Sequence, residues 1–163
     1  EGSAQAALWQ LRHGASQLLC VPPQGPLPRQ VLIHAIDADS RRATLAVAAS
    51  LLRHVAAEAV YLGIHPATAL EGERAACTRD LLDARSVALN EHGLDMRTEL
   101  RSGDVAEELQ KELVATEQAM LVIGTADPDR LNWEWLAGIL EGTPARPVLV
   151  VNASRVDAAV EAA

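Results

Sequence analysis

The stretch VLIHAIDADSRRATLAVAASLL, residues 31–52, predicts a strand, a turn and a helix in that order. The strand is a short apolar run that ends at Asp37, and Asp39 or Ser40 can cap the helix that follows. Apolar residues then recur every three or four positions, as they do along the buried face of a helix: Leu45, Ala48, Leu52 and Val55. A buried strand followed directly by such a helix is typical of a parallel sheet covered by helices.

The same alternation of strand and helix continues along the chain. Further strands are predicted at 59–64, 96–100, 120–123 and 147–151. Further helices are predicted at 68–92, 105–113 and 133–141. Parallel strands joined by helices require right-handed crossovers, which leave helices on both faces of the sheet. The sequence therefore predicts an α/β fold with a doubly wound, five-stranded parallel sheet.

The net charge, the cysteine spacing and the length of the apolar runs each disfavour a class of partner or site. The formal net charge of −8 disfavours binding to nucleic acid and to anionic membrane surfaces. Cys20 and Cys77 lie too far apart in the sequence to indicate a disulfide framework or a zinc site. No apolar run reaches the ~18 residues that a membrane span needs. We therefore expect a cytoplasmic protein that does not insert into a membrane and has neither a nucleic-acid partner nor a metal.

Catalytic residues are not indicated either. The five histidines share no metal-ligand spacing, and no serine lies in a Gly-x-Ser-x-Gly turn. No pair of a nucleophile and a general base can be argued from the sequence. We therefore predict that the chain is not an enzyme.

Four segments in order resemble the universal stress protein family. Residues 31–52 resemble its first strand and helix, LRSGDVAEEL (100–109) its third-strand turn, AMLVIGT (119–125) its fourth strand and ARPVLVVN (145–152) its closing strand. The resemblance covers residues 30–152, and it implies the strand order 3-2-1-4-5. It also implies pairing through the last strand, 147–151, either with a second copy or with a tandem domain. The family includes tandem proteins and the cytosolic tails of membrane transporters, so a transporter in the same polypeptide is a further candidate partner.

Members of this family divide into those that bind ATP and those that do not. The resemblance places Asp37 at the end of the first strand, where Ala38 replaces the usual glycine. Ile64 matches the position whose backbone meets the adenine, and Gly124 and Thr125 match the start of the phosphate-binding loop. If a nucleotide such as ATP or AMP binds, these matched residues are the predicted contacts: Asp37, Ile64, Gly124 and Thr125.

The loop that follows, within LVIGTADPDRLNWEW (121–135), departs from the family pattern. Binding members carry Gly-x-x-Gly-x9-Gly-Ser/Thr, whereas Glu134 and Trp135 stand at the final pair here, and the segment is shorter. Glycines in such a loop let backbone N–H groups close on phosphate oxygens. Asp127 and Asp129 would instead each repel one unit of phosphate charge by roughly 2 kcal/mol at ~8 Å. We therefore predict that ATP binding is lost and that the chain has no cofactor.

The two ends of the chain lie outside the resembling domain. Residues 23–29 are predicted to be a proline-rich linker and 153–163 a C-terminal tail. Residues 1–22 end in LWQLRHGASQLLCVP (8–22), which resembles both the family's closing segment and LAGILEGTPARPVLVVN (136–152) of this chain. They are interpreted as the end of a preceding, similar domain, and the alternative is an added helix and strand. We expect 17–21 to pair antiparallel with 147–151 of the same or a neighbouring chain.

These observations favour a non-enzymatic regulatory or interaction domain of universal-stress-protein type that pairs through its last strand. The alternative is a nucleotide-binding module for stress response or transporter regulation that uses Asp37, Ile64, Gly124 and Thr125. A third hypothesis, a weak ATP hydrolase, has no specific residue in its favour. The shortened loop favours the first hypothesis, and the retained matched residues favour the second.

Overall fold

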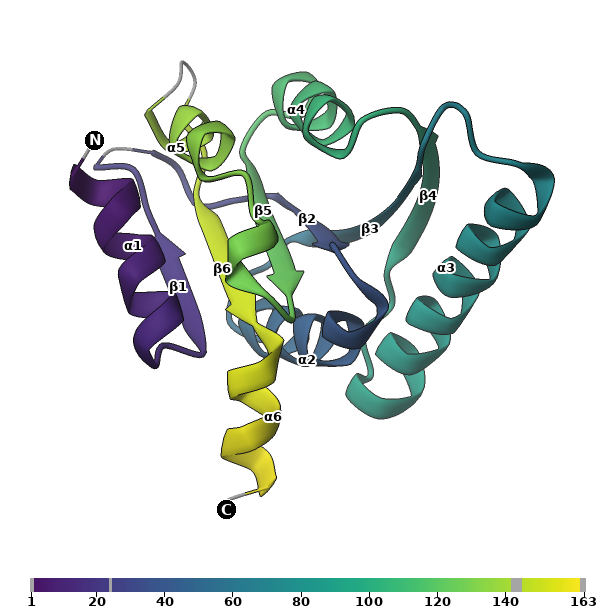
Figure 1. Cartoon of the computed structure of the whole chain (residues 1–163), viewed down its shortest axis with the longest axis horizontal. Coiled ribbons are helices and arrows are strands. Elements are labelled where there is room, and N and C mark those ends of the chain that lie inside the picture. The colour runs from purple at the N-terminus through teal and green to yellow at the C-terminus, as the bar shows by residue number, and fades with distance from the viewer. Residues whose placement is uncertain (1, 24, 142–144, 162–163) are drawn as a thin grey trace.

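A single six-stranded sheet runs through the computed structural model, in the order β1-β6-β5-β2-β3-β4 (Figure 1). The structure describes residues 2–23, 25–141 and 145–161. The strands are β1 (Gln17–Cys20), β2 (Gln30–Ala35), β3 (Glu58–His65), β4 (Arg97–Ser102), β5 (Ala119–Thr125) and β6 (Val148–Asn152). The five strands from β2 to β6 pair in parallel with one another, so the fold class is α/β with a mostly parallel sheet.

The prediction of a five-stranded, all-parallel sheet was wrong, because a sixth strand is present. β1 pairs antiparallel with β6, in a register that places Gln17 opposite Val151 and Cys20 opposite Val148. The apolar residues before the linker join the edge that β6 would otherwise leave unpaired. The expected antiparallel pairing of 17–21 with 147–151 is thereby confirmed for residues 17–20 and 148–151, and it forms within the same chain.

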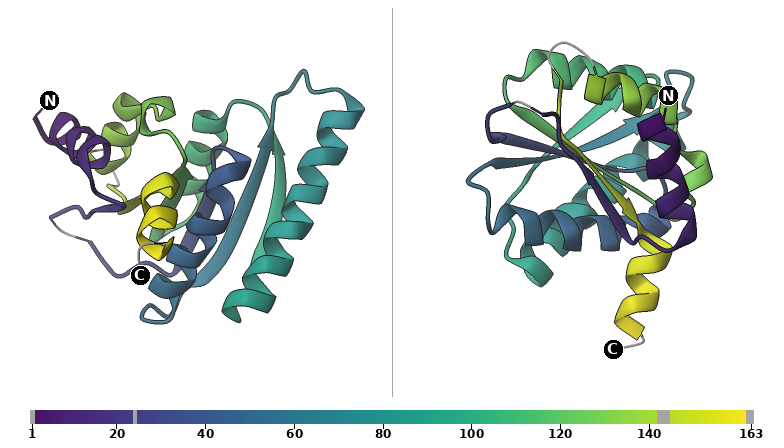
Figure 2. Two further views of the ribbon diagram at one scale, coloured as in Figure 1. Left: turned by 60° about the horizontal axis from the view of Figure 1, so that its bottom comes forward. Right: turned by 90° about the vertical axis from the view of Figure 1, so that its left-hand side faces the viewer.

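Helices cover both faces of the sheet (Figure 2). The helices are α1 (Gly2–His13), α2 (Arg41–Leu52), α3 (Glu71–His92), α4 (Val105–Ala115), α5 (Trp133–Glu141) and α6 (Ala153–Glu161). Residues of α2, α3 and α6 pack in one core cluster, and residues of α1, α4 and α5 pack in the other. Two short 3-10 turns, Ala38–Ser40 and Pro128–Arg130, follow β2 and β5 at the carboxyl edge of the sheet.

Successive strand residues supply the two clusters. In β2, Val31 and Ile33 belong to the α2 side, whereas Leu32 belongs to the α5 side, and all three are buried. Every residue of β5 and of β6 is buried. Such strands need apolar side chains on both faces and a paired strand at both edges, which explains their continuous Val, Leu and Ile runs.

Local signals in the sequence account for several helix ends. Gly93 terminates α3 in the left-handed conformation, with φ of 64°, where a residue with a side chain would be strained. Asp104 caps α4 by accepting a hydrogen bond from the Glu107 amide at 3.1 Å. The described residues of the linker 23–29 contain no helix or strand, and residues 153–161 of the predicted tail are helical.

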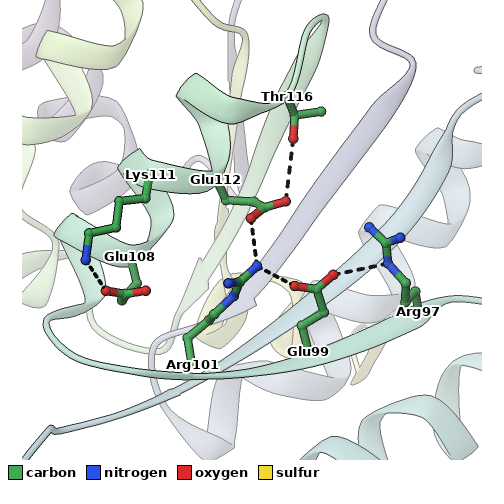
Figure 3. Close-up of polar contacts among 7 residues, drawn as sticks. All are labelled: Arg97, Glu99, Arg101, Glu108, Lys111, Glu112 and Thr116. Carbon is green, nitrogen blue, oxygen red and sulfur yellow. Dashed lines mark hydrogen bonds and ion pairs between the residues drawn. The ribbon is translucent and has the colours of Figure 1, made fainter.

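Charged residues line β4, the strand at the far edge from β1 (Figure 3). Glu99 lies between two arginines, 3.3 Å from Arg97 and 2.5 Å from Arg101. Arg101 also contacts Glu112 of α4 at 2.9 Å, and Glu112 lies 3.5 Å from the Thr116 hydroxyl. We call Arg97, Glu99, Arg101 and Glu112 the β4 charge ladder.

None of the helices in the described part of the chain has the length and apolarity that a membrane crossing requires.

Candidate functional site

The carboxyl ends of β2 and β5 meet where the strand order reverses, which is the usual ligand position in a parallel sheet. Ala35 of β2 lies opposite Gly124 of β5 in the sheet. The Ile36 amide donates to the Gly124 carbonyl at 2.9 Å, so the two strands stay paired to the end. Two side chains stand at this point: Asp37 follows β2 by two residues, and Thr125 is the last residue of β5.

Both oxygens of the Asp37 carboxylate accept hydrogen bonds from the protein. One oxygen accepts from the Ser40 amide at 2.8 Å and so caps the turn before α2. The other accepts from the Thr125 hydroxyl at 3.2 Å and from the Ala126 amide at 3.0 Å. Asp37 therefore ties the start of α2 to the loop after β5, across the crevice that a phosphate would enter.

Thr125 also makes its hydroxyl contacts within the protein. Its side chain is 0% exposed. Its hydroxyl accepts from the Asp127 amide at 3.0 Å and lies 2.8 Å from the Asp127 carbonyl. These contacts hold the loop in a tight turn on its own residues. The hydroxyl that would face a phosphate is buried within that turn.

Gly124 has a packing role in this structure. A Cβ atom at this position would lie 1.6 Å from the Thr44 hydroxyl oxygen, so no side chain fits without moving α2. Thr44 is itself buried, and its hydroxyl donates to the Ser40 carbonyl at 2.6 Å. The glycine that the sequence assigns to a phosphate loop is therefore required for the close approach of α2 to β5.

The loop after Thr125 is held by α1 as well as by itself. Asp127 accepts from the Asp129 amide at 3.0 Å, and the Trp133 indole N–H donates to the Pro128 carbonyl at 3.2 Å. The Asp129 carboxylate forms an ion pair with Arg12 of α1. Part of the negative charge that the sequence places in this loop is therefore neutralised by the N-terminal helix. Sequence reasoning missed Arg12, because the pair joins residues 117 positions apart.

Trp133 and Trp135 lie in the first turn of α5, directly after the shortened loop. Both are half-buried and pack against the cluster on the α5 side of the sheet. The Trp135 amide donates to the Asn132 side chain at 3.0 Å, so Asn132 caps α5. Bulky aromatic residues thus occupy the segment where binding members of the resembling family carry glycines.

Ile64 lies apart from the other three candidates, at the end of β3. It lines a cavity of about 170 Å³ between the ends of β2 and β3, together with Asp37, Ala38, Arg41 and Tyr61. Ligand sites for small molecules are usually about 300–1,000 Å³, so this cavity is small. Of the four predicted contacts, Asp37 alone borders both this cavity and the closed crevice; Gly124 and Thr125 belong to the crevice.

The polar groups around the cavity are already paired or neutral. Arg41 contacts the Asp80 carboxylate of α3 at 3.2 Å. Burial raises the pKa of Tyr61 to about 12, so its phenol is neutral at physiological pH. Burial also lowers the pKa of His34, whose Nδ1 donates to the Leu62 carbonyl at 2.8 Å. The cavity therefore offers a phosphate no unpaired cation among these residues.

Ser40, Thr44 and Arg41 are the further site residues that sequence reasoning missed as members of the site. The sequence indicates Ser40 only as a helix cap, whereas its hydroxyl lies 2.9 Å from the Asp37 carbonyl and 3.2 Å from the Gly124 carbonyl. Its spacing of three residues from Asp37 is the one signal that could have indicated this contact. Within the described residues, no group of three His, Cys, Asp or Glu side chains is arranged to hold a metal ion.

Comparison of the sequence with protein-family models and with curated proteins gave no match. Membership of the universal stress protein family therefore stays a prediction.

Proposed function

We propose that this chain is a non-enzymatic regulatory or interaction domain of universal-stress-protein type in which ATP binding is lost. The observation that carries the proposal is the double use of Asp37. Its carboxylate accepts from Ser40 on one side of the crevice and from Thr125 and Ala126 on the other. A triphosphate would have to break these contacts and then face an acidic loop.

The strand topology supports the interaction role. The five strands from β2 to β6 lie in the order β4-β3-β2-β5-β6, which is the order that the resemblance implies. The last of them carries an antiparallel partner, β1, that comes with its own helix. On this proposal α1 and β1 are the end of a similar domain, and β6 is the surface through which the two domains pair. Cytoplasmic placement, in a tandem protein or a transporter tail, is part of the same proposal.

Calorimetric titration with ATP, with and without magnesium, tests the loss of binding. We expect no saturable heat at ATP concentrations up to about 1 mM. A dissociation constant of about 1 mM would correspond to a binding free energy of about −4 kcal/mol. Replacing Asp127 and Asp129 with glycine should not restore binding, because Asp37 still closes the crevice. A dissociation constant below ~10 μM for the unchanged protein would contradict the proposal.

The nucleotide-binding alternative keeps one observation in its favour, the cavity of about 170 Å³ beside Ile64. On this alternative, adenosine or AMP places its base there and leaves the phosphate in solvent. Titration with adenosine and AMP separates the two functions. Ala38→Trp is the substitution designed to block this cavity, because Ala38 is exposed and lines it. Saturable binding that this substitution abolishes would favour the alternative.

A further inference from the structure

A second cavity lies between the N-terminal pair of elements and the rest of the domain. Its volume is about 350 Å³, within the usual range of small-molecule sites. Four elements line it: α1 through Ala7, β1 through Cys20, α5 through Ala137, and β6 through Val148. The segment after β1 also lines it, through Val21, which is 64% exposed, so the cavity is open on one side. The helices α1 and α5 are in contact and lie on the same face of the sheet (Figure 1).

The chemistry of this cavity is apolar. Among the described residues that line it, none is charged. The Trp133 indole N–H already donates to the Pro128 carbonyl at 3.2 Å. The Cys20 thiol is half-buried and is a weak hydrogen-bonding group. The lining side chains therefore offer few hydrogen bonds to the water that enters the cavity from its open side.

A space of this size and chemistry favours an apolar occupant. An apolar molecule that enters would remove the apolar lining from water, which is favourable in proportion to the apolar area buried. Small-molecule sites in proteins are lined mostly by apolar side chains, as this cavity is. A charged headgroup would find no counter-ion in the lining, and the net charge of −8 opposes an anion further.

We infer that the cavity between α1, β1, α5 and β6 is a binding site for a small uncharged apolar molecule, such as an alkyl chain or an alicyclic compound. The ligand would contact both the N-terminal elements and the domain that they pack on. Its binding would therefore stabilise the docked position of α1 and β1, because a ligand shifts an equilibrium toward the state that binds it. This inference does not depend on whether ATP binds.

Titration with 1-octanol and 1-decanol, followed by calorimetry, tests the site. We expect saturable binding of one molecule for each chain, with octanoate and decanoate bound more weakly than the alcohols. Ala137→Leu should weaken binding by ~10-fold or more, because the larger side chain takes up space in the cavity. Ala75→Leu is the control, since Ala75 is exposed on α3, and it should bind as the unchanged protein does.

Alkylation of Cys20 locates the ligand independently. In a Cys77→Ser background, Cys20 is the single remaining cysteine, and burial raises the pKa of its thiol, so labelling is done at alkaline pH. Bound 1-decanol should slow labelling of Cys20, and Ala137→Leu should remove that protection. Absence of saturable binding would overturn the inference. So would binding that neither protects Cys20 nor responds to Ala137→Leu.

Discussion

The two outer strands of the sheet differ in the side chains that they carry. β4 ends the sheet at one side with the charge ladder of Arg97, Glu99, Arg101 and Glu112, whose members contact one another at 2.5–3.3 Å (Figure 3). β1 ends it at the other side with Gln17–Cys20, whose last three residues are apolar. Charged side chains on an edge strand oppose pairing with other chains, whereas exposed apolar edges permit it.

The contrast shows which strand needs a partner. β4 is half-exposed and ends the sheet with its own side chains. All five residues of β6 are buried, so β6 has the environment of a central strand although it is the last strand of the predicted domain. β1 and α1 give it that environment. The N-terminal elements are therefore part of the folded unit, and the following predictions test the difference between the two edges.

Removing β1 should have the largest effect. Deletion of residues 1–28 takes away α1 and β1 and exposes one edge of β6 together with part of the core cluster around Leu11. We expect dimerisation through β6, or aggregation, because an apolar edge strand pairs with whatever strand is available. Light scattering coupled to size exclusion measures this. A soluble monomer with unchanged stability toward urea would show that β1 contributes nothing at this edge.

A single substitution in α1 should give an intermediate effect. Leu11 is 0% exposed and packs in the cluster on the α5 side. Leu11→Ala should reduce the free energy of unfolding by ~3 kcal/mol, as large-to-small changes in a core do. Trp9→Ala is the control on the same helix, since Trp9 is 61% exposed, and it should cost less than ~1 kcal/mol. Equal losses in urea unfolding would mean that α1 is not docked as described.

The β4 charge ladder should contribute least. Arg101 and Glu112 are partly exposed, and ion pairs of this kind are weakened by solvent and salt. A double-mutant cycle of Arg101→Ala and Glu112→Ala should give a coupling energy of ~0.5–1 kcal/mol that decreases at high salt. Neither substitution should change the oligomeric state, unlike the deletion of residues 1–28. A coupling above ~2 kcal/mol, insensitive to salt, would contradict this account of the edge.

Much of the fold could be predicted from local sequence patterns. The continuous apolar runs at 31–36 and 120–123 are strands because both faces of the sheet are covered. The pairing of 17–21 could be predicted because an apolar segment and an apolar closing strand both need a partner. The predicted strand number is nevertheless wrong, because the prediction of five strands covers residues 30–152 only and does not count the strand at 17–20, although its pairing with the closing strand is expected.

The candidate site was less predictable, because its contacts join distant parts of the chain. The sequence places a carboxylate after β2, but it does not say whether Asp37 caps a helix or binds a ligand. The answer lies in hydrogen bonds to Thr125 and Ala126, 88 and 89 residues away. Gly124 likewise matches a phosphate-loop glycine in sequence, whereas the position of Thr44 in α2 gives it a packing role.

Backbone geometry provides a direct comparison within β6. The Asn152 amide donates to the Ser16 carbonyl at 2.8 Å, on the β1 side of the strand. Successive N–H groups point to opposite sides of a strand, so those of Val148 and Val150 also face β1. The alternate N–H groups of β6 face β5, which is a fully buried strand. The two sets of amides therefore report separately on the two edges of one strand.

Amide hydrogen exchange along β6 is the measurement that tests most directly whether β1 completes the sheet. Val148 and Val150, which face β1, should exchange within ~10-fold of the rates of Leu149 and Val151, which face β5, because both edges are paired within the chain. Exchange of Val148 and Val150 at the rate of unpaired amides, with Leu149 and Val151 still protected, would show that β1 is undocked and would contradict the account.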